Sequence, residues 1–210
     1  MTEPTARQFE IKSREQLFYT LTEAAEIEHN LMCCYLYAAF SLKDAATDGL
    51  SPDDDAIVAR WRRAIIGVAV EEMSHLALVA NLTTAVGCAP HFGRPNFPIA
   101  AGYHPAGVQV KLAPFDPETL QHFVFLERPD GSAEMDGPGF SPATAYQRSL
   151  GAHNTLMPSG QDYDTVGDLY RAIAHGFRFL AERGRRPRII TPYSWGGRIP
   201  PTHAPSSPPS

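Results

Sequence analysis

The 210-residue sequence has little of what marks several common protein classes. It contains three cysteines, of which Cys33 and Cys34 are adjacent, so neither a disulfide framework nor a cysteine zinc site is expected. The net charge of −5 gives no electrostatic reason to expect nucleic acid or an anionic membrane as a partner. The first residues lack the apolar core of a signal peptide, and Glu, His or Arg interrupts every long apolar run. These absences predict a cytoplasmic protein without a membrane span.

What the sequence does contain is enough apolar material for one globular domain. Hydrophobic residues make up 43% and charged residues 20% of the chain, which is typical of a globular protein. A chain of this length is also long enough to bury a sizeable core. We expect a helical domain over residues 1–185, followed by a tail over residues 186–210. The tail is basic and then rich in Pro and Ser, so an extended conformation is predicted for its end.

Capping and stop signals predict four helices and almost no strand. Ser13 and Gln16 form a capping box at the start of the first helix. Ser51 followed by Pro52 begins the second helix, and Gly87 ends it. The predicted order is a helix over 13–43, a helix over 51–86, a loop over 88–114, a helix over 116–128, a loop over 130–163 and a helix over 165–184. Four helices with long loops favour an all-α bundle, and loops of this length are uncommon unless they serve a function.

Acidic residues lie on the apolar faces of the predicted helices. Residues three, four or seven positions apart share one face of a helix, and this phase places Glu28 in a stripe with Leu21 and Tyr35. Glu26 falls on a more polar side of the same helix, with Asn30. We therefore expect Glu28 to point into the bundle and Glu26 to point elsewhere.

The stretch "EEMSHLALVANL" repeats this arrangement in the second helix, where Glu72 and His75 lie one turn apart on the core stripe. In the short third helix, Glu127 shares a face with Leu120 and Phe123. Three carboxylates and one imidazole are thus expected to converge on the interior, where each uncompensated ion would cost several kcal/mol. Two outcomes are compatible with this: the groups share protons and hydrogen bonds, or they coordinate a cation. Carboxylates with an imidazole suit Fe or Mn, and the lack of a thiolate cluster disfavours structural zinc.

Four separated blocks, in order, carry a resemblance to a known family: "AAEIEHNLMCCYLYAAFSLK", "EEMSHLALVANLTTAVG", "HFVFLERP" and "TVGDLYRAI". They resemble the ferritin-like iminophenyl-pyruvate dimer synthase family over roughly residues 15–183. Members of that family occur as domains of enzymes that couple arylpyruvate imines in violacein- and rebeccamycin-type pathways. The resemblance implies a ferritin-like fold and oxidative chemistry in natural-product biosynthesis.

The ferritin-like template has one Glu from each of two helices and Glu-x-x-His from each of the other two. The last helix of this sequence lacks a Glu-x-x-His. Asp168 stands where the family block more usually has Glu, although Thr165-x-x-Asp168 is also typical of a capping box. A loop histidine, His104 or His153, is the other candidate to complete a second metal position. The predicted metal ligands are Glu28, Glu72, His75, Glu127 and Asp168.

The function implied is that of an iron-dependent oxidase or oxygenase that acts with O₂ on an aromatic amino-acid-derived substrate. The expected cofactor is one or two Fe ions, with Mn as the alternative metal. Tyr35 lies two turns from Glu28 on the same stripe and is the predicted catalytic residue. It would hydrogen-bond a ligand carboxylate or lie near the oxidant, and an ordinary core tyrosine explains it equally well.

The residues also leave a non-catalytic interpretation open. In this alternative the chain is a ferritin-like assembly module, and its internal acids are hydrogen-bonded and free of metal. A homodimer is a further expectation, because Phe179 lies on the polar side of the last helix and indicates a partner surface. No nucleic-acid or membrane partner is expected.

Overall fold

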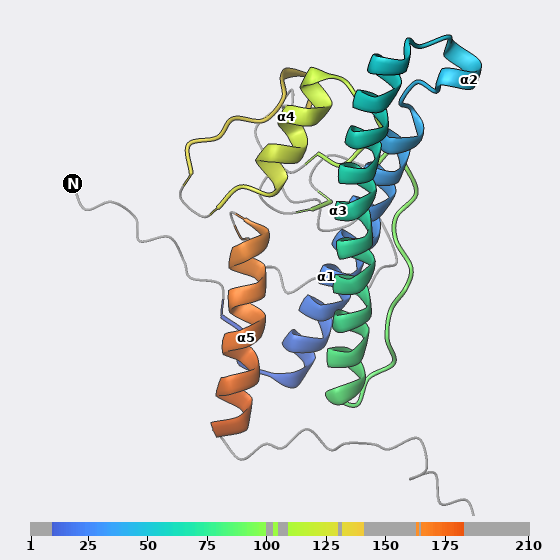
Figure 1. Ribbon diagram of the computed structural model, residues 1–210. Coiled ribbons are helices and arrows are strands. Elements are labelled where there is room, and N and C mark those ends of the chain that lie inside the picture. The colour runs from blue at the N-terminus through green and yellow to red at the C-terminus, as the bar shows by residue number, and fades with distance from the viewer. Residues whose placement is uncertain are drawn as a thin grey trace, which may run out of the picture.

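Two long antiparallel helices, α1 (Arg14–Phe40) and α3 (Pro52–Ala85), run the length of the molecule (Figure 1). The short helix α2 (Ala45–Asp48) lies in the connection between them. The structure is a computed structural model that describes residues 10–99, 103–104, 109–129, 132–140, 163 and 165–182.

The start of α1 follows directly from its sequence. The Ser13 side chain accepts a hydrogen bond from the Gln16 backbone N–H, and the Gln16 side chain accepts one from the Ser13 backbone, which completes the predicted capping box. The helix ends at Phe40, before the predicted end near Lys43. The predicted inward stripe is buried throughout, and its members are Leu17, Leu21, Ala24, Glu28, Leu31, Tyr35 and Ala38.

The start of α1 is tied to the end of α3. The Arg14 guanidinium donates hydrogen bonds to the backbone oxygens of Val86, at 2.7 Å, and Gly87, at 3.0 Å. Gly87 has a φ of 77°, a conformation that favours glycine and ends the helix as predicted. At the other end of α3, Ser51 accepts a hydrogen bond from the backbone N–H of Asp54, so both predicted boundaries of this helix are confirmed to within a residue.

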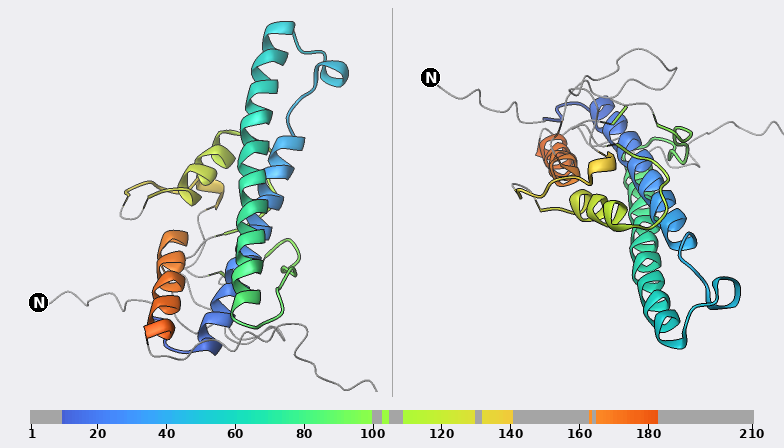
Figure 2. Two further views of the ribbon diagram at one scale, coloured as in Figure 1. Left: turned by 60° about the horizontal axis from the view of Figure 1, so that its bottom comes forward. Right: turned by 90° about the horizontal axis from the view of Figure 1, so that it is seen from above.

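The helices α4 (Pro117–Leu126) and α5 (Val166–Glu182) follow one another along the same side of the α1–α3 pair (Figure 2). Asp116 caps α4 by accepting a hydrogen bond from the Thr119 backbone N–H. A 3₁₀ turn, η2 (Pro138–Phe140), packs on α4, where the Phe140 ring stacks on the His122 ring with centroids 3.8 Å apart. The inner face of α5 is formed by the buried residues Leu169, Ile173 and Leu180.

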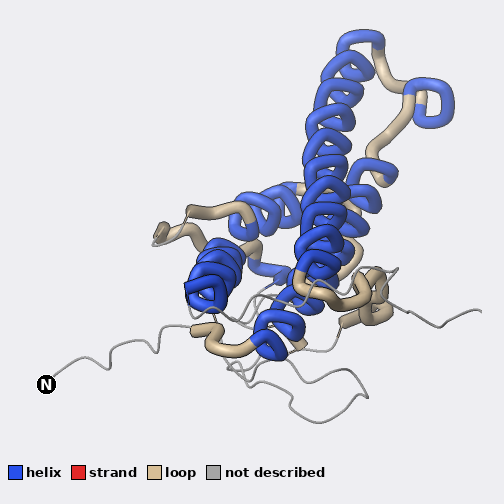
Figure 3. The backbone as a smooth tube through the Cα atoms, turned by 90° about the horizontal axis from the view of Figure 1, so that it is seen from below, coloured by secondary structure: helices blue, strands red, loops and turns tan. Residues whose placement is uncertain are grey.

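The all-α prediction is confirmed, since the described residues contain helices and loops but no strand (Figure 3). The two predicted long loops separate α3 from α4 and α4 from α5. The predicted tail over residues 186–210 lies outside the described residues, so the boundary at 185 stays a prediction.

The more polar side of α1, which carries Glu26 and Asn30, is also buried. The Glu26 carboxylate accepts a hydrogen bond from Tyr103 at 2.6 Å and lies 3.1 Å from Nε2 of His91. Asn30 is fully buried, and its Nδ2 lies 3.1 Å from Nε2 of His104. The loop after α3 folds back over this side of α1, which helical phase alone does not reveal.

Helix α3 is more apolar than we expected from the sequence. By length and composition, α3 is long and apolar enough to cross a membrane, although we expected charged residues to interrupt every such run. Only 17% of the apolar stretch of α3 that meets these criteria is buried. A helix that packs against other protein meets the same length and composition criteria, so this finding identifies an exposed apolar helix and nothing more specific.

Candidate metal centre

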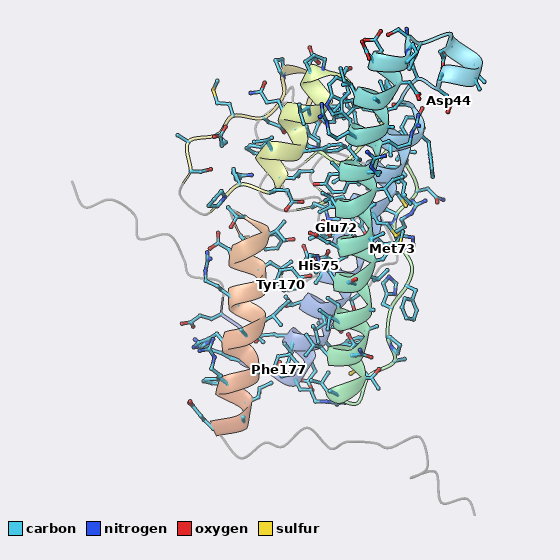
Figure 4. The ribbon with its side chains drawn as sticks, in the orientation of Figure 1. Asp44, Glu72, Met73, His75, Tyr170 and Phe177 are labelled. Atoms are coloured by element: carbon cyan, nitrogen blue, oxygen red, sulfur yellow. The ribbon has the colours of Figure 1, made fainter. Side chains whose placement is uncertain are left out.

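Two carboxylates and one imidazole meet between α1 and α3. Nδ1 of His75 lies 3.2 Å from Oε2 of Glu28 and 3.3 Å from Oε2 of Glu72. One ligand atom from each of the three residues lies within 4.8 Å of the other two. Figure 4 shows Glu72 and His75 on α3 directed toward the side on which α5 carries Tyr170. The structure therefore brings together three of the five predicted ligands.

The centre is buried on one side and exposed to solvent on the other. The side chains of Glu28 and Glu72 are 2% and 5% exposed, whereas that of His75 is 50% exposed. Helical phase placed His75 on the core stripe, but its imidazole lies at the edge of the contact between α1 and α3 and is half exposed. The two carboxylates thus lie at the bottom of the site, and the imidazole forms its solvent-accessible edge.

Burial and like charge disfavour the ionised carboxylates. Burial raises the pKa of Glu28 above its ordinary value. Burial raises the pKa of Glu72 to about 9, with further contributions from the hydrogen bond and the charge of Glu28. Two adjacent buried carboxylates without a cation therefore retain a proton near neutral pH, and a bound cation would replace that proton.

One oxygen of the centre lacks a well-formed hydrogen bond. Oε2 of Glu28 is buried and accepts no hydrogen bond of good geometry from the part of the chain that the structure describes, although Nδ1 of His75 lies 3.2 Å away. Buried polar atoms in native proteins normally have a partner. Since this oxygen faces Glu72 and His75, its free lone pairs point to the place where a cation would bind.

Two tyrosine hydroxyls at the edge of the centre donate hydrogen bonds to carboxylates. The Tyr170 hydroxyl, from α5, donates a short hydrogen bond to Oε1 of Glu28. The Tyr35 hydroxyl, from α1, donates one to Oε1 of Glu127 at 2.7 Å. Burial raises the pKa of both phenols, so both remain protonated donors. This agrees with the expectation that Tyr35 hydrogen-bonds a candidate ligand.

Glu127 lies beside the centre, but not on the inward face of a helix as predicted. The helix α4 ends at Leu126, and Glu127 is its exposed C-cap residue. Leu120, which was placed on the same inward face, is 49% exposed, so that part of the phase argument was wrong. The negative charge of Glu127 nevertheless contributes to the raised pKa values of Glu28 and Glu72. Glu127 therefore lies beside the three-residue centre as a further acid.

Asp168 does not join the centre. Its backbone N–H donates to Oγ1 of Thr165 at 3.1 Å, and its Oδ2 accepts from the Thr165 backbone N–H at 3.2 Å. Its Oδ1 pairs with Arg171 on the outer side of α5. Both carboxylate oxygens are thus engaged in a capping box and an ion pair, and the geometry supports the capping interpretation over the ligand prediction.

Comparisons with known proteins agree with the helical fold. The family model described as ferritin-like matches residues 21–197. The chain belongs to the ferritin-like family. No solved structure matches the chain significantly.

Two curated relatives of this ferritin-like chain carry informative names. One is the 2-imino-3-(indol-3-yl)propanoate dimerase of Chromobacterium violaceum, which is 32% identical over 68% of the chain. The other is the dichlorochromopyrrolate synthase of Lentzea aerocolonigenes, 26% identical over 83% of the chain. The matches cover 16% and 18% of these relatives, so the chain spans less than a fifth of their length. The predicted resemblance to ferritin-like dimer synthases is confirmed.

Of the two loop histidines, the structure describes His104, which does not complete the ferritin-like site. His104 is buried against Asn30, on the side of α1 away from Glu28. His153 lies outside the described residues. Phe179, expected to mark a partner surface, packs partly buried against the core.

The residue that sequence reasoning missed is Tyr170. Its hydrogen bond to Glu28 joins residues 142 positions apart. No local pattern reports a contact of that separation. A tyrosine among aliphatic residues on a core face was the one available signal, because a buried phenol usually has a hydrogen-bond partner.

Proposed function

We propose that this ferritin-like chain is an iron-dependent oxidase-type enzyme of natural-product biosynthesis, with iron held by Glu28, Glu72 and His75. The observation that carries the proposal is the buried Oε2 of Glu28, which accepts no well-formed hydrogen bond from the described residues and faces a second carboxylate and an imidazole. Carboxylate and imidazole donors from facing helices are those of the ferritin-like di-iron and di-manganese sites, so they suit Fe, with Mn as the alternative. The donors present therefore fit the metal.

The chain's own residues would position the metal and keep its surroundings dry. Tyr170 occupies Oε1 of Glu28, which leaves Oε2 for the metal. Tyr35 orients Glu127 at the edge of the site, where a third carboxylate would join. The buried side of the centre excludes water, and the half-exposed His75 leaves an approach for substrate and O₂. Iron, when bound, supplies the one-electron and O₂ chemistry that no side chain provides.

The substrate class comes from the relatives. One is named for a dimerase of an indole-bearing imine and the other for a chromopyrrolate synthase. We infer that this chain acts on an aromatic amino-acid-derived substrate with O₂ as the oxidant. The cytoplasmic location expected from the sequence stays part of the proposal.

A second candidate function has its own observation. With its raised pKa, Glu72 can remain protonated and share hydrogen bonds with Glu28 and His75 in the absence of metal. The chain would then be a metal-free ferritin-like module that serves assembly. The two candidates differ in whether the purified protein takes up iron.

Metal content after anaerobic Fe(II) loading and desalting separates them. We expect about one or two irons per chain in the wild type and loss of iron in Glu72→Gln, which removes a ligand charge but keeps the side-chain shape. Glu71→Gln is the matched control, because its carboxylate is the exposed neighbour on the same helix and should leave iron content unchanged. A wild type that retains no iron would contradict the iron-dependent proposal and favour the assembly module.

A further inference from the structure

The outer face of α3 is exposed along most of its length. Figure 1 shows α3 at the front of the molecule, with no helix in front of it. On this face, Val70 is 51% and Leu78 59% exposed. We define the outer face by six exposed residues of shared helical phase: Arg63, Gly67, Val70, Glu71, Ser74 and Leu78.

This face lacks the composition of a solvated helix surface. A surface helix normally carries charged or polar residues opposite its buried stripe. Between Arg63 and the end of α3 at Ala85, the outer face carries one charged residue, Glu71, because Glu72 points toward α1. The same paucity of charge lets α3 meet the length and composition criteria of a membrane span. The outer face therefore has the character of a surface that another structure covers.

Gly67 lies at the middle of this face, and no contact among the described residues requires a glycine there. A Cβ atom built on Gly67 would meet no atom within 4 Å, so nothing in the described fold requires its absence. Glycine in a helix interior lowers helix stability relative to alanine. Glycine is useful where another backbone approaches closely, and the open space beside Gly67 is where such an approach would occur.

The charges around Gly67 are arranged symmetrically. Arg63 lies four residues before Gly67 and Glu71 four residues after it, on the same face. Among the residues that the structure describes, neither side chain has an ion-pair partner. A second α3 crossing antiparallel at Gly67 would place each Arg63 against the Glu71 of the other copy, because a two-fold interface is self-complementary. A parallel crossing would instead place like charges together.

We propose that the outer face of α3 is a homodimer interface, in which two copies of this chain pack antiparallel with Gly67 at the two-fold axis. The interface buries Val70 and Leu78, and two Arg63–Glu71 pairs flank the crossing point. A lipid surface fits this face less well, because a membrane-surface helix has a basic polar face, whereas here one acid lies within the apolar patch. This interface is separate from the metal ligands, so it does not depend on the proposed iron chemistry.

Charge reversal tests the pairing across chains. We expect the full-length wild type to sediment as a dimer. Arg63→Glu alone and Glu71→Arg alone should each raise the dimer dissociation constant at least about tenfold, because each creates two like-charge contacts. An equimolar mixture of the two variants should recover a heterodimer, since the two acidic side chains of one variant would then face the two basic side chains of the other. Glu134→Arg, an exposed charge reversal on the loop after α4, is the control and should sediment as the wild type does.

Recovery in the mixture also shows that both variants are folded, which circular dichroism would verify separately. A monomeric wild type would overturn the proposal, and so would single variants that dimerise as tightly as the wild type. Sedimentation with vesicles of phosphatidylcholine and phosphatidylglycerol tests the competing occupant. A wild type that binds vesicles and remains monomeric in their absence would replace the dimer by a lipid-binding face.

Discussion

The phenol of Tyr170 in α5 donates a hydrogen bond to Oε1 of Glu28 in α1, and this contact joins the last described helix to the candidate metal centre. Glu28 is 2% exposed. The other oxygen of Glu28 accepts no well-formed hydrogen bond from the described residues. Tyr170 therefore satisfies Oε1 of Glu28. The other oxygen, Oε2, is the one that would bind the proposed metal.

Removing this hydroxyl should destabilise the metal-free protein. Tyr170→Phe leaves Oε1 of Glu28 buried without its donor, which costs about 1–3 kcal/mol of unfolding free energy. Tyr35→Phe should cost less, because its acceptor, Glu127, is exposed and can be hydrated instead. Urea unfolding of both variants measures the difference. Tyr37→Phe, on a tyrosine that is 46% exposed, is the control, and equal losses in all three variants would contradict the assigned role of Tyr170.

The metal-free protein should lose stability as the pH rises. The pKa of Glu72 is about 9 in the folded chain, against an ordinary value of 4.5. Between these values the unfolded chain has released a proton that the folded chain keeps. Unfolding free energy therefore falls with each pH unit from about 5 to about 9 and levels off above this range. The raised pKa of Glu28 acts in the same direction.

Thermal melts across this pH range would show the effect. Glu72→Gln has no proton to release at this position, so its stability should depend less steeply on pH than that of the wild type. Glu71→Gln should keep the wild-type slope. A wild-type protein whose stability rises between about pH 5 and about pH 9 would show that the sign is wrong.

A pair of leucine variants tests which faces of α4 and α5 point inward. Leu169 is fully buried and Leu120 is 49% exposed. Leu169→Ala should cost about 2–5 kcal/mol of unfolding free energy, because it leaves a core cavity. Leu120→Ala should stay within about 0.5 kcal/mol of the wild type, as exposed positions usually do. Denaturant titration of both variants decides the assignment, and a large loss at Leu120 would restore the original phase argument.

Cys34 should resist thiol reagents. Its side chain is 3% exposed, and burial raises its pKa from 9.0 to about 12. Since the thiolate is the reactive species, Cys34 should react with iodoacetamide more slowly than the partly exposed Cys88. Peptide mass spectrometry after timed labelling measures both rates. Labelling in urea is the control, because all three cysteines should then react alike, and equal rates in the folded protein would contradict the burial of Cys34.

The parts of the fold that sequence predicted depend on local chemistry. Ser13 with Gln16, Ser51 with Pro52 and Asp116 form caps through atoms within a few residues of one another, so their signals are complete in the sequence. Helical phase likewise placed Glu28 and Glu72 on buried faces, because the α-helical repeat is regular. The same regularity misled at Glu127, since α4 ends at Leu126 and phase has no meaning beyond a helix end.

The sequence by itself determined which segments become helices, where most of them begin, and that Glu28 and Glu72 lie on buried helix faces. Only the tertiary structure decided which groups complete their surroundings. The loop after α3 buries Glu26 and Asn30, Thr165 and Arg171 engage Asp168, and Tyr170 reaches Glu28. Most of these contacts join residues far apart in the chain, and their geometry is set by how the helices and loops pack rather than by a repeating local pattern. Packing is a property of the whole chain, so only the folded molecule specifies it.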